Sequence, residues 1–69
     1  MKKNERVLIR TSSLLTFIGV VVDNEFIYDN SEAIILKTSD KSSIMMIIPY
    51  NEVKEVFHMD GKVENYNVQ

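Results

Sequence analysis

The residues best suited to bind a ligand lie in and around a short polar turn late in the chain. Tyr50 and Asn51 directly follow Pro49. An aromatic ring can stack on any nucleobase, which contributes roughly 1–3 kcal/mol per base, and an Asn side chain can read a base edge. Lys54 and Arg10 could meet the phosphates. These residues are the candidate site for RNA or a nucleotide-type ligand; alternatively, Tyr50 covers a barrel mouth and Asn51 satisfies its own turn.

Catalytic chemistry has less support in the sequence. His58 and Asp60 could be drawn as an acid–base pair, although a histidine near a chain end is more often structural. Asp23, Glu25 and Asp29 form an acidic cluster without the glycine and terminal Glu of a calcium loop, so we expect a solvated hairpin loop. There is no nucleophile–base pair in context, no glycine-rich phosphate loop and no metal-ligand spacing. We therefore expect no enzyme, no cofactor and no metal site.

Length and charge limit the possible functions further. A chain of 69 residues is one small domain, which buries only roughly 60% of the surface exposed on unfolding. Because it has no cysteine, self-association is the favoured additional source of stability. The net charge is −2, whereas proteins that rely on phosphate contacts usually have a basic surplus. The apolar run LLTFIGVVV is too short for a membrane-spanning helix, so we expect a cytoplasmic protein.

Runs rich in Val, Ile, Phe and Tyr alternate with polar clusters, which predicts an all-β protein. Inside the second run, Gly19 would let a strand bend sharply or let another backbone approach closely. Pro49 has no N–H and belongs at a strand end, so residues 50–52 are expected to form one tight turn of the 3₁₀ kind. The predicted strands cover residues 6–11, 14–22, 33–38 and 43–48, with a short fifth strand from Val53 onward.

The two ends of the chain are predicted separately. Residues 1–5 could form a short helical turn. The predicted domain comprises residues 1–60, and residues 61–69 form a polar tail that is either disordered or an additional edge strand.

Three stretches resemble the Sm-like family of small barrels, which includes the Hfq-type RNA chaperones. TFIGVV is similar to the family's strand of aromatic, glycine and valine at alternate positions, here Phe17, Gly19 and Val21. YDNSEAIILKT resembles an Asp-containing turn with its apolar strand, and IIPYNEVKEV resembles the strand, turn and strand that close the barrel. The resemblance spans roughly residues 6–58. It implies a five-stranded, strongly bent Sm-like (SH3-type) barrel that forms rings and binds single-stranded RNA at the subunit turns.

The chain departs from the family at both RNA-contacting turns. After Asp29 the family has Asn beside an apolar residue, where this chain has Glu32 and Ala33. The second turn carries Arg-Gly in Sm proteins, or Tyr-Lys-His in Hfq-type proteins, where this chain has Pro-Tyr-Asn. The segment between Gly19 and Asp29 is also longer than usual. These differences affect the RNA site more than the fold.

The fourth predicted strand is apolar on both faces, because Met45 and Met46 point to opposite sides. Methionine adapts to irregular packing, and a charge-free, β-prone strand is hazardous as an exposed edge. In the Sm-like family the fourth strand of one subunit pairs with the fifth of the next. We therefore expect a homo-oligomeric ring, a hexamer or heptamer. Its expected interface residues are Ile44, Met45, Met46, Ile47, Val53 and Val56.

Two functions are open at this point. The first is a ring-forming Sm-like protein that binds single-stranded RNA or nucleotide-type ligands at Tyr50, Asn51, Lys54 and Arg10. The alternative is a non-catalytic protein-interaction or assembly module on the same small barrel, PRC- or SH3-like, without nucleic acid. The barrel pattern and the basic N-terminal segment favour the first. The negative net charge and the missing Arg-Gly or Lys-His pair favour the second.

Overall fold

The computed structural model describes residues 1–39, 41 and 43–66, and in them the protein is all-β. Six strands and one short 3₁₀ helix follow one another along the chain. The elements are β1 (Arg6–Thr11), β2 (Thr16–Tyr28), β3 (Ser31–Lys37), β4 (Met45–Pro49), η1 (Tyr50–Glu52), β5 (Val53–His58) and β6 (Val63–Asn65). Across the described ranges, every helix is too short or too polar to cross a membrane.

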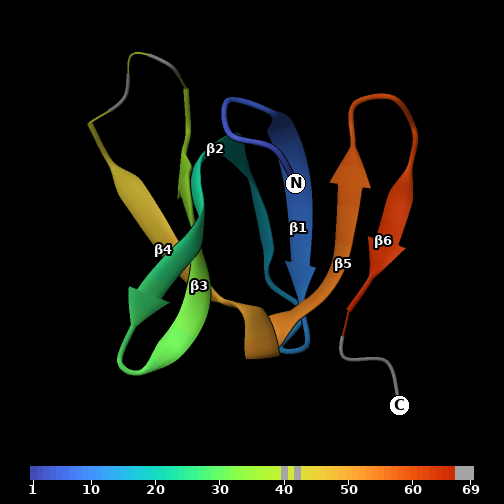
Figure 1. Cartoon of the computed structure of the whole chain (residues 1–69). Helices are drawn as coiled ribbons and strands as arrows, with labels where there is room; N and C mark the ends of the chain where they lie inside the picture. The colour runs from blue at the N-terminus through green and yellow to red at the C-terminus, as the bar shows by residue number, and fades with distance from the viewer. Residues whose placement is uncertain (40, 42, 67–69) are drawn as a thin grey trace.

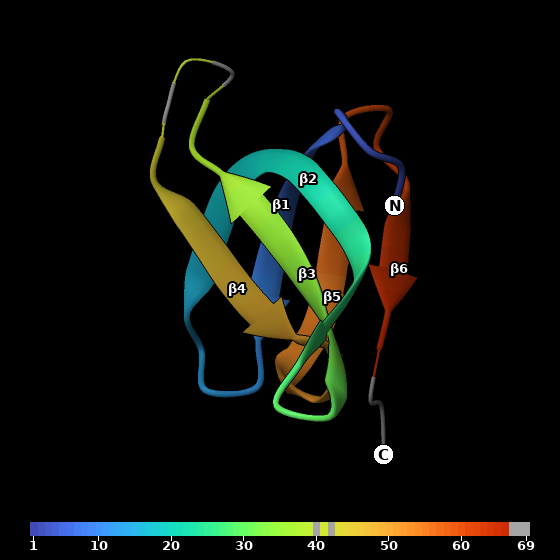
Figure 2. The same ribbon diagram turned by 60° about the vertical axis from the view of Figure 1, so that its left-hand side comes forward.

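The strands form one antiparallel sheet in the order β4-β3-β2-β1-β5-β6. The first half of β2 pairs with β1 and the second half with β3, and its register with β3 shifts on both sides of Asp23. Such irregularities let a strand bend. Figure 1 shows β3 and β4 on the left and β5 and β6 on the right. Figure 2 shows that β2 itself is bent into an arch. In the described residues β4 and β6 are not paired with each other, so the sheet curls without closing.

The concave side of the curled sheet carries the core. Val7 and Ile9 of β1 point inward and are 2% and 0% exposed, whereas Leu8 between them points outward. The rest of the central cluster is Val21, Ile34, Leu36, Ile48, Val53 and Val56. Partly buried side chains pack around this cluster: Met1, Phe17, Met46, Tyr50 and Tyr66. Residues from both ends of the described chain thus contribute to one core.

Gly19 lies where two strands approach each other closely. It pairs with Val7 of β1, and the next residue, Val20, pairs with Lys37 at the end of β3. A Cβ added to Gly19 would lie only 2.4 Å from the Lys37 carbonyl oxygen, which is too close for two non-bonded atoms. The close backbone approach therefore requires glycine, which is one of the two roles predicted for it.

The all-β class and the 3₁₀ turn at residues 50–52 are confirmed, but the predicted number of strands was wrong. The sheet has a sixth strand, because part of the polar tail pairs with β5. Two of these pairs are Val56 with Glu64 and Phe57 with Val63. Of the tail's two alternatives, the edge strand is correct for residues 63–65, and residues 67–69 lie outside the described residues.

Two further expectations need correction. Asp23 and Glu25 lie within β2 instead of a hairpin loop, because β2 continues to Tyr28 with its outward side chains in solvent. Only Asp29 lies in the turn, where its φ is 52°. Residues 1–5 form a turn and not a helical one, since Asn4 has a left-handed φ of 69°.

Candidate functional site

Tyr50 lies in η1 between β4 and β5, with its side chain packed against the core. β4 ends at Pro49, whose φ is −61° and which has no N–H to donate to a strand ladder, and Tyr50 follows directly in the turn. The Tyr50 hydroxyl donates a 2.7 Å hydrogen bond to the carbonyl oxygen of Asn24 in β2. Its ring centroid lies 6.0 Å from that of Tyr66, with the rings tilted by 44°. Both ends of the Tyr50 side chain are thus engaged within the protein.

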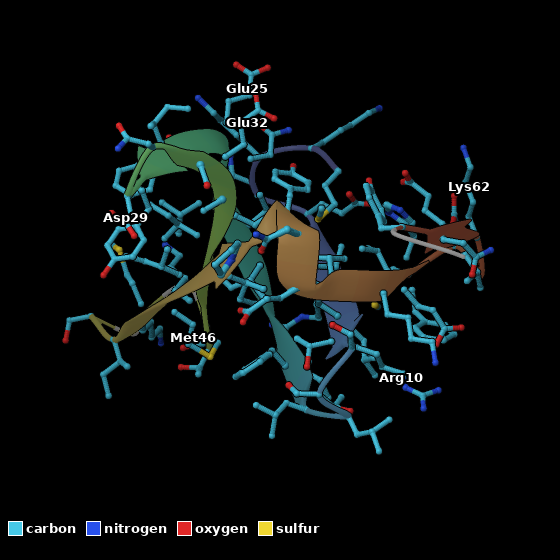
Figure 3. All side chains as sticks on the ribbon, turned by 90° about the horizontal axis from the view of Figure 1, so that it is seen from below. Arg10, Glu25, Asp29, Glu32, Met46 and Lys62 are labelled. Atoms are coloured by element: carbon cyan, nitrogen blue, oxygen red, sulfur yellow. The ribbon has the colours of Figure 1, made fainter. Side chains whose placement is uncertain are left out.

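The surroundings of Tyr50 are negatively charged. Burial raises the pKa of the phenol above its ordinary value of 10.0. Nearby carboxylates raise this pKa further: Glu32, Glu25, Glu64 and Asp23. Figure 3 shows Glu25 and Glu32 at the same end of the molecule. Because these carboxylates repel phosphate, they disfavour a polyanion beside Tyr50.

Asn51 is exposed and lines a hollow of about 220 Å³ between η1 and the β2–β3 turn. The other lining residues are Tyr28, Asp29, Ser31, Pro49 and Glu52. The lining includes two carboxylates and no lysine or arginine. Asn51 can donate and accept hydrogen bonds there, but a phosphate would find no basic side chain in this lining.

The two basic residues of the predicted RNA site lie on β1 and β5. Arg10 is on β1, and its Nη1 lies 3.4 Å from Oε1 of Glu55 on β5. In Figure 3 Arg10 points to the side opposite Glu25 and Glu32. Lys54 is exposed on β5. The structure thus places Tyr50 and Asn51 in one turn and directs Arg10 to another side of the molecule.

The six residues predicted for an oligomer interface divide into two groups. Ile44, Met45 and Ile47 are 69%, 54% and 43% exposed along the β4 edge, and Met46 is partly buried against the core. Val53 and Val56 are both 0% exposed. Their side chains belong to the core of this chain and present no surface to another copy. The outer edge of β5 is moreover paired with β6.

A cluster that the sequence did not predict joins both ends of the described chain. The ring of His58 lies between two carboxylates: Nδ1 is 2.7 Å from Oε2 of Glu5, and Nε2 is 2.5 Å from Oε1 of Glu64. The His58 side chain is only 7% exposed. Oε2 of Glu64 also accepts a 2.9 Å hydrogen bond from the Tyr66 hydroxyl. Asp60 instead accepts a hydrogen bond from the backbone N–H of Lys62.

The register of the strands explains why these side chains meet. His58 pairs with Val7 and Glu64 with Val56, and both partners point into the core. Residues paired across antiparallel strands share a face, so His58 and Glu64 also point inward. Glu5, two residues before Val7, has the same orientation by alternation. The three polar groups occupy the end of the core, where they satisfy one another.

The contacts within the cluster shift the pKa values of its members. The hydrogen bond to Glu5, followed by that to Glu64, raises the pKa of His58 above 6.5 against the effect of burial. Burial raises the pKa of Glu5, but hydrogen bonds from His58 and the Lys2 backbone hold it below 4.5. For Glu64 the hydrogen bond from Tyr66, opposed by burial and aided by His58, lowers the pKa. Burial and then the bond to Glu64 raise the pKa of Tyr66 to about 12.

The cluster borders a hollow of about 280 Å³. Its lining is Met1, Lys2, Glu5, His58, Asp60, Lys62 and Glu64. Among the residues that the structure describes, no three His, Asp or Glu side chains are arranged to hold a metal ion. Because each ring nitrogen of His58 is already bonded to a carboxylate, the cluster is an ion-pair network.

The outward side of the sheet carries an in-register apolar row, which we call the outward row. It consists of Ile18, Leu8, Phe57 and Val63, on β2, β1, β5 and β6 respectively. Leu8 pairs with both Ile18 and Phe57, and Phe57 pairs with Val63. Ile18 and Val63 are 54% and 44% exposed. Arg10 and Glu55 form the ion pair beside this row.

Comparison of the chain with protein-family models, with curated proteins and with solved structures found no match. The functional argument therefore depends on the geometry of this chain alone.

Proposed function

We propose that the protein is a non-catalytic assembly module that associates with a second copy of itself along β4. The observation that carries this proposal is the composition of that sheet edge. β4 has a partner strand on one side only in the described residues, and Ile44, Met45 and Ile47 are exposed along it. Residues 43–51 contain no charged side chain. An uncharged strand that has a partner strand on one side only is a template for strand pairing.

The architecture behind this proposal is a bent sheet of the Sm-like, SH3-type kind. The order β4-β3-β2-β1-β5, the long bent β2 and the 3₁₀ turn between β4 and β5 support it. In a family ring, β4 of one subunit pairs with β5 of the next. Here β6 lies on the outer edge of β5. A contact between two β4 edges avoids this obstacle and gives a two-fold dimer, a common arrangement.

Charge also favours two β4 strands meeting. The chain has a net charge of −2, so two copies as a whole repel each other weakly, and an uncharged contact surface avoids adding to that repulsion. At the opposite edge β6 carries Glu64. Antiparallel pairing of two β4 strands about Met46 instead places Met45 beside Ile47 of the second copy. Both side chains point outward, so pairing extends one apolar surface across the dimer.

The test is the molar mass in solution, measured by light scattering over a range of concentrations. We expect a dimer for the unmodified chain and a monomer for Ile47→Lys, because each lysine would then lie beside the apolar Met45 of the other copy and add a charge to the junction. Ile18→Lys is the matched control, since Ile18 has a similar exposure but lies in the outward row.

Each outcome decides between arrangements. A dimer that Ile18→Lys dissociates and Ile47→Lys leaves intact would move the contact to the outward row. A hexamer or heptamer would favour the ring that the family resemblance implies. A monomer at every concentration would reject self-association. Circular dichroism of both variants shows whether the fold survives the added charge.

A further inference from the structure

We propose that the Glu5–His58–Glu64 cluster is a proton-operated clasp, which holds β6 and the N-terminal segment against the sheet while His58 is charged and loosens both when it is neutral. This inference does not depend on the proposed self-association. The cluster takes no part in the proposed contact between two β4 strands.

With both glutamates ionised, the His58 ring can donate a hydrogen bond to each of them only when it carries two protons. A neutral imidazole has one N–H and one bare nitrogen, whereas the imidazolium donates from both nitrogens. Nδ1 faces Glu5 at 2.7 Å and Nε2 faces Glu64 at 2.5 Å. If either proton leaves, one carboxylate oxygen faces a nitrogen lone pair at hydrogen-bond distance. That contact changes from attractive to repulsive, so one of the two segments must move away.

The segment most exposed to this change is β6. It is three residues long, and its side chains are exposed or half-buried, so little apolar burial fixes it. Its other attachments are the short pairing with β5, the Tyr66 N–H on the Lys54 carbonyl, and the His58 N–H on the Lys62 carbonyl. Because Glu64 is the middle residue of β6 and makes the strand's side-chain contact with His58, losing that contact weakens the attachment of the strand.

The N-terminal segment has independent attachments. The Asn4 N–H donates to the Val21 carbonyl at 2.7 Å, and the Val21 N–H donates to the Glu5 carbonyl at 2.8 Å. Asn24 donates to the Met1 carbonyl, and the Met1 side chain packs against the core. We therefore expect β6 to loosen before the N-terminal segment when His58 becomes neutral.

Other charged groups near the cluster also contribute to the electrostatic environment of His58. The Met1 ammonium lies 4.0 Å from Oε1 of Glu64, which is too long for a hydrogen bond. Lys2, Asp60 and Lys62 line the adjoining hollow. Of these residues, Lys2 also donates its backbone N–H to Oε1 of Glu5 at 3.0 Å. If β6 loosens, the edge of β5 that pairs with it becomes exposed.

The test is amide hydrogen exchange followed by NMR at about pH 5.5 and about pH 9, below and above the expected titration of His58. Protection factors remove the intrinsic pH dependence of exchange. We expect the protection of the Tyr66 amide to fall at least about tenfold between the two pH values. The Ile9 amide, in the centre of β1, should keep its protection.

Two variants separate the clasp from a general effect of pH. Glu64→Gln should show weak Tyr66 protection already at the lower pH and little further change. Glu52→Gln, an exposed acid in η1, should behave as the unmodified chain. Unchanged Tyr66 protection in the unmodified chain at both pH values would overturn the proposal, even if Glu64→Gln failed to fold. The same holds if Glu64→Gln folds and keeps the full pH dependence.

Discussion

Nδ1 of His58 lies 2.7 Å from Oε2 of Glu5, although 53 positions separate the two residues in the sequence. Glu5 immediately precedes β1 and His58 ends β5, so the contact joins the start of β1 to the end of the neighbouring strand β5. Glu64 on β6 completes it from the other side of the ring. One imidazole thereby links three segments of a sheet that does not close.

The stability of the fold should be highest in mildly acidic solution. The raised pKa of His58 contributes stability that is complete below about 6.5 and is lost as the pH rises through the folded value. The lowered pKa values of Glu5 and Glu64 contribute stability that is present above about 4.5 and is lost as the pH falls. Denaturant unfolding at several pH values should therefore give a maximum between these limits.

His58→Gln identifies the group responsible for the alkaline side of this maximum. We expect a loss of roughly 1–3 kcal/mol in mildly acidic solution, the usual range for hydrogen bonds to charged groups. The free energies of unfolding of the variant and the unmodified chain should converge in alkaline solution, where His58 is neutral. Parallel curves across the whole range would show that another group titrates.

Gly19→Ala should destabilise the protein by about 1–3 kcal/mol, because the new Cβ meets the Lys37 carbonyl oxygen and two strands must separate. Gly61→Ala is the matched control: nothing lies within 4 Å of its added Cβ, and only the φ of 91° is unfavourable. For that control we expect a smaller loss, of about 1 kcal/mol. Thermal and denaturant unfolding measure both. Equal losses would contradict the close-approach role of Gly19.

How far the sequence predicts this structure depends on the range of each interaction. The alternation of Val7, Leu8 and Ile9 sets a strand and its buried face locally, and Pro49 ends β4 by its own covalent geometry. The course of β2 beyond residue 22 depends on its pairing with β3. Acidic residues in that half are typical of loops, and only the sheet register makes them part of a strand.

The candidate site also has a part that is set locally and a part that depends on residues distant in the sequence. The turn at Tyr50 and Asn51 was predictable, because the residue types and the proline define it. The partners of Tyr50 were not, since Asn24 and Tyr66 reach it only through the bend of β2 and the addition of β6. The sequence suggests Asp60 as the partner of His58 because the two are close along the chain, whereas the structure places Glu5 and Glu64 on the ring. The alternation of Val63 and Glu64 after a glycine turn is the signal that could have indicated β6.

Glu64→Gln should lower the pKa of Tyr66 from about 12 toward that of an ordinary phenol. The hydroxyl of Tyr66 donates to a charged carboxylate, and ionisation of the phenol would place two negative charges together. Loosening of β6 in the variant should also reduce the burial of Tyr66, which lowers the pKa in the same direction. NMR titration of the tyrosine ring signals measures this, with Tyr66→Phe to assign the resonance. An unchanged Tyr66 pKa in Glu64→Gln would mean that burial alone sets it.

RNA binding at the Tyr50 turn is the remaining prediction, and neutralising the nearby carboxylates tests it most directly. Since four carboxylates act on Tyr50, we expect oligo(U) and oligo(A) to bind weakly or not at all at moderate salt. Glu25→Gln combined with Glu32→Gln should then strengthen any binding that uses this turn, whereas Glu55→Gln, beside Arg10, should act only on binding at the opposite side. Fluorescence anisotropy at low and moderate salt distinguishes these cases. Tight, salt-resistant binding by the unmodified chain that Tyr50→Ala abolishes, with the fold intact by circular dichroism, would establish the RNA site after all.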